Sequence, residues 1–146
     1  MQALAQRVSS AKIHIDSKVY SSINRGILAY VCFDKEDNEE VIEKFIHKII
    51  NFSFFQGDRG LMSASLKEIK GELMIVSQFT LSAVTNNKGN KPSFHKSAGT
   101  EKAKNLYDLL IKRLNEYPIH FQSGVFGSDM DIHSKNAGPV TFSFKI

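Results

Sequence analysis

The chain has 146 residues, of which 42% are hydrophobic and 23% charged, the composition of one globular domain with enough apolar side chains for a core. Its net charge of +4 allows a polyanionic partner but excludes a strongly basic protein that coats nucleic acid. The single cysteine excludes an internal disulfide and no apolar run reaches the roughly 20 residues of a membrane span, so we expect one soluble, cytoplasmic domain over residues 1–146.

The first part of the chain predicts three strands. Residues 3–15 alternate between apolar and polar side chains and bend near Ser9-Ser10, and residues 18–23 form a second short run. A turn at Asn24-Arg25-Gly26 leads into the apolar run 27–33, whose cysteine we expect in the core.

A helix is predicted over residues 38–51. Asp37-Asn38 offers an N-cap, apolar side chains recur at helical spacing, and His47 falls on the opposite, solvated face. The segment after this helix has a weaker pattern. We predict a turn or loop at residues 56–60 and a short edge strand at residues 64–69.

The stretch of residues 72–81 is the one around which the rest of the chain is organised. Residues 73–76 are apolar and include β-branched side chains, which predicts a strand buried on both faces. The polar side chains of Ser77, Gln78 and Thr80 follow at its C-terminal end, and a hydroxyl or amide that loses water without a new partner costs roughly 1–3 kcal/mol. Since ligands bind beyond the carboxyl ends of strands in open α/β sheets, these groups predict a ligand site. The alternative is a strand end satisfied by neighbouring loops.

The second half of the chain predicts a helix and three strands. A polar loop broken by Gly and Pro spans residues 85–92, and the helix begins at Thr100 and ends before Pro118. The strands follow at residues 119–122, 125–132 and 140–146. The predicted order is β-β-β-α-β-β-α-β-β-β, an α+β fold in which two helices cover one face of a mixed sheet.

Several common chemistries are missing from the sequence. The five histidines show no spacing typical of a zinc site, and there is no Walker loop, dinucleotide fingerprint or serine-nucleophile elbow. We therefore expect neither a metal nor a cofactor. A second polar stretch, residues 136–141, contains Gly138-Pro139, which on its own indicates only a turn.

Five short motifs occur in order along the chain. They are Gln6-Arg7-Val8, residues 77–81, residues 91–94, residues 124–130, and Asn136-x-Gly138-Pro139-Val140-Thr141. In this order and at these spacings, the chain resembles the D-aminoacyl-tRNA deacylases (the D-tyrosyl-tRNA deacylase family) from end to end. It departs from the family at Ala137, where an acidic residue is usual, and at Lys91, where arginine is commoner.

The resemblance implies a fold, a reaction and an assembly. The fold is a mixed, partly barrel-like sheet with two helices packed on one face, in three layers. The reaction is hydrolysis of the ester that joins a D-amino acid to tRNA, together with glycyl-tRNA mischarged on tRNA-Ala, as chirality proofreading in translation. The assembly is a homodimer in which a cis Gly138-Pro139 peptide reaches into the partner's pocket, with no cofactor and no membrane.

The resemblance also implies which residues form the site. The catalytic pocket is assigned to Ser77, Gln78, Phe79 and Thr80. Substrate binding is assigned to Gly138, Pro139, Arg7, Met130 and Asn136. Contacts with tRNA are assigned to Lys88, Lys91, Phe94 and Lys96. The plainer alternatives are a surface position for Arg7, a core position for Phe79 and a solvated loop around the lysines.

An aminoacyl ester is already activated, so positioning and hydrogen-bond donors can supply much of the catalysis. We therefore expect Thr80 to shape the pocket, with water or the 2′-hydroxyl of the terminal ribose assisting hydrolysis. An L side chain is expected to collide with the backbone at Gly138-Pro139, whereas a D side chain or the hydrogen of glycine does not. Two alternatives remain open: a noncatalytic nucleic-acid-binding protein on the same fold, and a related deacylase acting on a small L-aminoacyl-tRNA.

Overall fold

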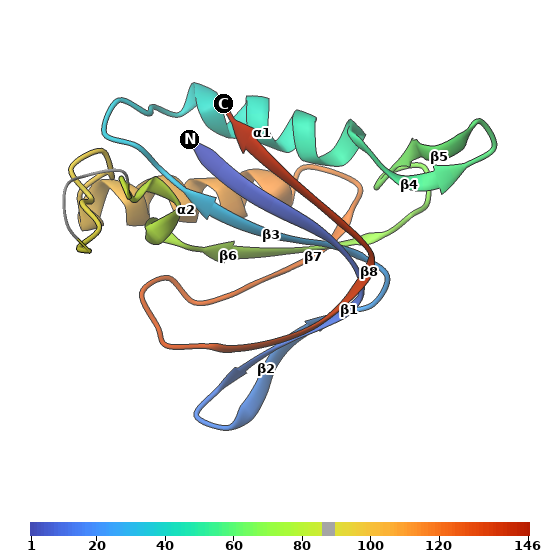
Figure 1. The fold of residues 1–146 in the computed structure, drawn as a ribbon, viewed down its shortest axis with the longest axis horizontal. Helices are drawn as coiled ribbons and strands as arrows, with labels where there is room; N and C mark the ends of the chain where they lie inside the picture. The colour runs from blue at the N-terminus through green and yellow to red at the C-terminus, as the bar shows by residue number, and fades with distance from the viewer. Residues whose placement is uncertain (86–89) are drawn as a thin grey trace.

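A computed structural model of the chain describes residues 1–85 and 90–146 (Figure 1). Its elements, in chain order, are β1 (Gln2–Ile15), β2 (Lys18–Ile23), β3 (Gly26–Cys32), α1 (Glu40–Asn51), β4 (Ser53–Gly57), β5 (Gly60–Ser65), β6 (Glu72–Ser77), the 3₁₀ turn η1 (Phe79–Ser82), α2 (Thr100–Leu114), β7 (His120–Ser123) and β8 (Asp131–Lys145). Among these residues, no helix is long and apolar enough to cross a membrane.

The main sheet is mixed and curls on itself. Its strand order is β2-β1-β3-β6-β7, and β8 pairs with β1. The strands β3, β6 and β7 run parallel to one another, whereas β1 is antiparallel to β2, β3 and β8. The hydroxyl of Ser21 in β2 donates to the carbonyl of Ser123 in β7 at 3.2 Å, which links the two ends of the strand order. The predicted α+β fold with a nearly barrel-shaped mixed sheet is confirmed.

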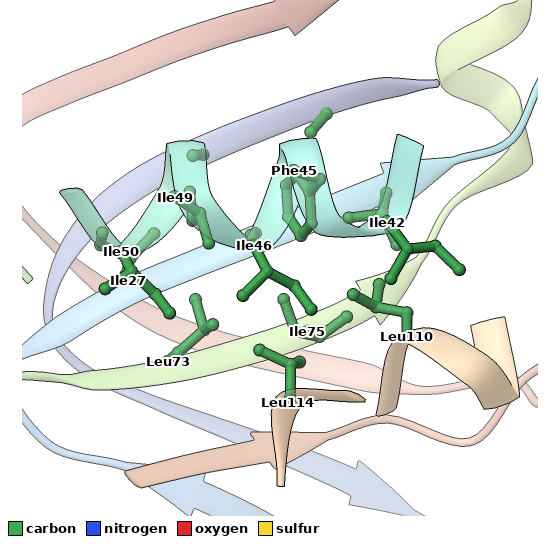
Figure 2. Packing of buried hydrophobic residues seen from close by; sticks show 14 of the residues in the cluster. Ile27, Ile42, Phe45, Ile46, Ile49, Ile50, Leu73, Ile75, Leu110 and Leu114 are labelled. Carbon is green, nitrogen blue, oxygen red and sulfur yellow. The ribbon is translucent and has the colours of Figure 1, made fainter. Parts of the chain in front are cut away.

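Both helices pack on one face of the sheet (Figures 1 and 2). Ile27 of β3 and Leu73 and Ile75 of β6 meet buried side chains of α1 and α2, such as Ile46 and Leu114. Leu28, Met74 and Val76 alternate with them and point to the other face, where they join a second buried cluster inside the curl. The predicted burial of residues 73–76 on both faces is therefore confirmed.

The two helices were placed almost correctly by the sequence pattern. Helix α1 begins at Glu40 instead of residue 38, because the Asn38 side chain accepts a hydrogen bond from the Glu40 N–H at 3.0 Å. Asp37 does not cap the helix and instead accepts from the Asp34 N–H at 2.7 Å. His47 is exposed and Cys32 is buried, as expected.

For residues 52–70, the predicted turn is present but the predicted strand is displaced. The turn expected within residues 56–60 is the two-residue connection Asp58-Arg59 of a hairpin, and its flanking residues belong to β4 and β5. The expected edge strand at residues 64–69 begins instead at Gly60 and ends at Ser65. The tight turn is possible because Gly60 adopts a φ of +114°, a conformation that favours glycine.

The C-terminal strands were also divided incorrectly. A single strand, β8, replaces the two predicted at residues 125–132 and 140–146, and residues 124–130 are not in a strand. Both halves of β8 pair with β1, from His14↔Asp131 to Gln2↔Lys145. Between the pairs Val8↔Asn136 and Gln6↔Thr141, four residues of β8 lie opposite Arg7 alone, so residues 137–140 form a bulge. The Gly-Pro pair marks this bulge and not a turn between two strands.

Candidate active site

A cavity of about 460 Å³ lies at the carboxyl ends of the parallel strands β3 and β6. Ser77, Gln78 and Phe79 form one wall together with Val31 and Cys32. The two strands are held in register here, because Val31 pairs with Ser77 and the Gln78 N–H donates to the Val31 carbonyl at 2.8 Å. The ligand site expected after residues 73–76 therefore coincides with a real cavity.

The 3₁₀ turn η1 fixes the position of Phe79 in this wall. The carbonyl of Phe79 accepts from the buried Ser82 hydroxyl at 2.9 Å and from the Cys32 thiol at 3.5 Å. Burial raises the pKa of Cys32, so the thiol stays protonated and can donate. These hydrogen bonds hold the backbone of Phe79, whose side chain is 59% exposed to solvent. Phe79 is therefore not a buried core residue, which was the alternative left open by the sequence.

Residues 126–130 form a second wall of the cavity. The Tyr107 hydroxyl of α2 donates to the carbonyls of Ile75 and Gly124, each at 3.1 Å, and the Gly124 N–H donates to the Ile75 carbonyl at 2.9 Å. A Cβ on Gly124 would lie 2.7 Å from the Met130 sulfur, so glycine at this position allows Met130 to pack closely. Met130, expected to bind substrate, lines the cavity together with Ser77 to Phe79.

An aromatic pair stands at the mouth of the cavity. The ring centroids of Phe79 and Phe94 lie 5.1 Å apart, and Phe94 is half-buried. Lys91 and Lys96 are exposed on the same segment. Of the residues expected to contact tRNA, Lys88 lies outside the described residues.

Thr80 occupies a different position from its three neighbours. It is exposed and is not among the residues that line the cavity. Within the described ranges, its hydroxyl forms no hydrogen bond with another residue, and neither a histidine nor a lysine lines the cavity. Nothing in this arrangement activates Thr80 as a nucleophile.

Arg7, Gly138, Pro139 and Asn136 gather elsewhere, around the bulge in β8. Arg7 donates from Nε to the Ala137 carbonyl and from Nη1 to the Phe54 carbonyl, each at 2.8 Å. Gly138 has a φ of +129°, the Gly138–Pro139 bond is cis, and both residues are exposed, as is Asn136. A second cavity of about 300 Å³ includes Arg7 and Gly138 in its lining and shares no residue with the first.

The structure therefore assembles the expected residues into two groups. Ser77, Gln78, Phe79 and Met130 lie around one cavity, whereas Arg7 and Gly138 line the other. The sequence pattern missed several residues of the first cavity, which are Val31, Cys32, Phe33, Ser97, Ala98 and Thr100. No local sequence signal marks the end of β3, because it is brought to the cavity only by the parallel pairing of residues 26–31 with residues 72–77. No group of three or more potential metal ligands occurs among the described residues.

Comparison with known proteins gives consistent matches over the whole chain. Residues 4–145 match the family model described as D-Tyr-tRNA(Tyr) deacylase. A D-aminoacyl-tRNA deacylase of Francisella tularensis subsp. tularensis is 43% identical over 146 residues, covering 100% of both chains. One of Finegoldia magna is 46% identical over 141 residues, covering 97% of this chain and 95% of the relative.

Two solved structures share the fold. A structure described as c-Myc DNA Unwinding Element Binding Protein has a TM-score of 0.92 and 34% identity, covering 100% of this chain and 99% of the other. A probable eukaryotic D-amino acid tRNA deacylase has a TM-score of 0.81, covering 99% and 98% of the two chains; at 17% identity it supports the fold alone.

Proposed function

The chain belongs to the D-Tyr-tRNA(Tyr) deacylase family, and we propose on this basis that its two residue groups are halves of one active site shared by two protomers. The reaction is that of the relatives, hydrolysis of D-aminoacyl-tRNA to free D-amino acid and tRNA, a proofreading step in translation. The cavity at the ends of β3 and β6, with Ser77 and Gln78 in its wall, is the observation that carries the assignment.

Dimerisation follows from the separation of the two groups. In one protomer, Gly138 and Pro139 are exposed on a bulge and do not line the cavity that contains Ser77 and Gln78. We propose that this bulge enters the corresponding cavity of a second copy. Among the described residues, β8 pairs only with β1, so its outer edge is free to meet a partner.

Each group then has a defined task. The side chains of Ser77 and Gln78 orient the ester and stabilise the oxyanion, while the exposed ring of Phe79 stacks on the terminal adenine beside Phe94. Thr80 supports the shape of this wall. Water attacks the ester carbonyl, assisted by the ribose 2′-hydroxyl, because the bond is already activated and needs no protein nucleophile.

Chirality is read by main-chain atoms of the bulge. Arg7 binds the Ala137 carbonyl and the Phe54 carbonyl, which holds the loop against β1 and β4. The loop carbonyls accept hydrogen bonds from the substrate ammonium, and an L side chain then points into the backbone. Glycine has no side chain to collide, so glycyl-tRNA mischarged on tRNA-Ala is a second proposed substrate. The proposed location is the cytoplasm, where aminoacyl-tRNA is used.

Initial rates of hydrolysis for matched D-Tyr-tRNA and L-Tyr-tRNA test this function. We expect cleavage of the D ester only, because rejection by a steric collision exceeds the factor of about 10–200 available from one methylene contact. Equal rates on both esters would remove the chirality mechanism, and faster cleavage of L esters would assign the chain to a related L-specific deacylase.

A second candidate function is nucleic-acid binding without catalysis. One observation favours it: the solved structure with 34% identity is named for binding a DNA unwinding element. Such a role does not require the cavity with Ser77 and Gln78 or the bulge with Gly138. Tight binding of DNA or tRNA with no hydrolysis of either ester would support it.

A further inference from the structure

The second cavity is lined by two arginines and by no acidic residue. Its volume is about 300 Å³, and its lining includes Arg7, Ser9, Arg25, Gln56 and Gly138 but no acidic residue. Among the residues that the structure describes, no carboxylate forms an ion pair with Arg7 or Arg25. Two guanidinium groups, each permanently charged, thus share a cavity that lacks a counterion from the protein.

Arg25 is held in place at the edge of this cavity. Its guanidinium carbon lies 5.5 Å from the centroid of the Phe55 ring, a cation–π geometry that leaves the N–H groups at the edge free to donate. Its backbone carbonyl accepts from the Glu72 N–H at 3.1 Å. The next residue, Gly26, packs so closely that a Cβ there would lie 1.8 Å from the Glu72 carbonyl oxygen. The Arg25 backbone therefore cannot shift far.

The carboxylate of Glu72, whose N–H binds the Arg25 carbonyl, is engaged elsewhere. The Glu72 carboxylate accepts from the Asn24 backbone N–H at 2.7 Å and from the Asn24 side chain at 3.2 Å. Arg7 is bound by two neutral carbonyls, which satisfy hydrogen bonds without cancelling its charge. An anion in the cavity would receive charge-assisted hydrogen bonds from the guanidinium groups of Arg7 and Arg25.

We propose that this cavity binds a backbone phosphate of the tRNA substrate, and that Arg25 is the residue that positions it. The inference rests on the proposed function, in which the Gly138 bulge enters the partner's active site. Arg25 lines the same cavity as Gly138, so it accompanies the bulge and faces the 3′ strand bound in that site. The amino acid's own carboxyl group is esterified, so the anions that the substrate brings are phosphates.

The test compares Arg25→Gln and Arg25→Lys with Arg59→Gln. Arg59 is an exposed arginine in the β4–β5 connection that lines neither cavity, so its variant loses the same charge at a different place. Two substrates are used, D-Tyr-tRNA and D-tyrosyl-adenosine, which carries the same ester but no phosphate. Circular dichroism and thermal melting confirm the fold of each variant.

Arg25→Gln is expected to raise KM for D-Tyr-tRNA about 3- to 10-fold with little change in kcat, the size of one ordinary hydrogen bond, because Arg25 is exposed to solvent. The slope of log(kcat/KM) against log[salt] is expected to become shallower by roughly 0.7, the value for one phosphate contact on a single strand. Hydrolysis of D-tyrosyl-adenosine is expected to be unchanged. Arg25→Lys should be intermediate and Arg59→Gln should match wild type.

The proposal is overturned if Arg25→Gln leaves KM and the salt slope for tRNA unchanged, or if it impairs D-tyrosyl-adenosine equally. Inorganic phosphate distinguishes a free anion from a tRNA phosphate. If inorganic phosphate competes with D-Tyr-tRNA in the wild-type enzyme but not in Arg25→Gln, the result supports the proposed phosphate subsite. A phosphate effect on D-tyrosyl-adenosine turnover would show an effector site instead and contradict the proposal. If wild type hydrolyses neither substrate, the proposed function fails, which is a separate result.

Discussion

At the scale of single residues, Gly138 and Arg7 are closely packed in the candidate site. A Cβ on Gly138 would lie 2.7 Å from Arg7 Nη2 and 3.0 Å from Val140 Cγ2. The guanidinium cannot move aside freely, because Nε and Nη1 each donate a hydrogen bond at 2.8 Å. The φ of +129° is also unfavourable for any residue with a side chain. Glycine is therefore required at this position.

Gly138→Ala is expected to reduce D-Tyr-tRNA hydrolysis on the order of 10- to 100-fold, since forcing an L residue into such a φ costs about 1–3 kcal/mol. No activity on L-Tyr-tRNA should appear. Gly60→Ala is the matched control, because Gly60 on the β4–β5 hairpin has a φ of +114° but an added Cβ there would meet no atom within 4 Å. Initial rates for both variants give the comparison, and an unimpaired Gly138→Ala enzyme would remove Gly138 from the site.

Thr80 is the residue for which type and position suggest different roles. Its hydroxyl is a possible nucleophile by type, but it is exposed and outside the cavity lining. Thr80→Ala is therefore expected to lower kcat only about 10-fold, which corresponds to about 1.4 kcal/mol of transition-state stabilisation. Single-turnover rates with D-Tyr-tRNA measure this. A loss of several orders of magnitude with unchanged tRNA binding would identify Thr80 as directly catalytic.

At the scale of elements, Tyr107 joins α2 to the end of β6 and to the segment that carries Met130. Its hydroxyl is buried and donates to two carbonyls, and burial raises its pKa above the ordinary value of 10.0. The ring also packs against Phe126, with centroids 5.7 Å apart. Both walls of the cavity near β6 thus depend on one side chain from the helix layer.

Tyr107→Phe is expected to lower the free energy of unfolding by about 1–2 kcal/mol at pH 8, because two buried carbonyls lose a donor. The pKa of Tyr107 is higher in the folded state than in the unfolded state. The protonated hydroxyl therefore contributes its full stabilisation below pH 10, and this contribution falls as the pH rises further. The difference between wild type and Tyr107→Phe should therefore shrink above pH 10. Urea unfolding of both proteins at pH 8 and above pH 10 measures it. A difference independent of pH would contradict the role of the buried hydroxyl.

Elements with a local signal were predictable from the sequence, and those defined by distant pairing were not. Helical spacing placed α1 within two residues of its start, and the apolar run before Ser77 identified the buried strand β6. The continuity of β8 was missed, because its two halves become one strand only by pairing with β1, more than a hundred residues away. Ser77 and Gln78 of the candidate site were predicted because they directly follow the apolar run of β6. Their neighbours on β3 were missed, because parallel pairing leaves no local pattern.

At the scale of the whole molecule, the proposed active site is complete only if two protomers combine. One chain presents Gly138 on an exposed bulge and Gln78 in a separate cavity. In a symmetric dimer, each bulge can enter the other protomer's cavity, which gives two equivalent sites. Light scattering should then give about twice the chain mass of 16.4 kDa.

A shared site is tested most directly by combining two impaired variants in one dimer. Gln78→Ala damages the cavity and Gly138→Ala damages the bulge, so each homodimer is expected to cleave D-Tyr-tRNA poorly. A heterodimer, purified through two different affinity tags, has one site with both defects and one site with neither. We predict about half of the wild-type rate per dimer, because one of two symmetric sites is intact. A heterodimer as inactive as its parents would contradict the shared site and place the whole reaction within a single chain.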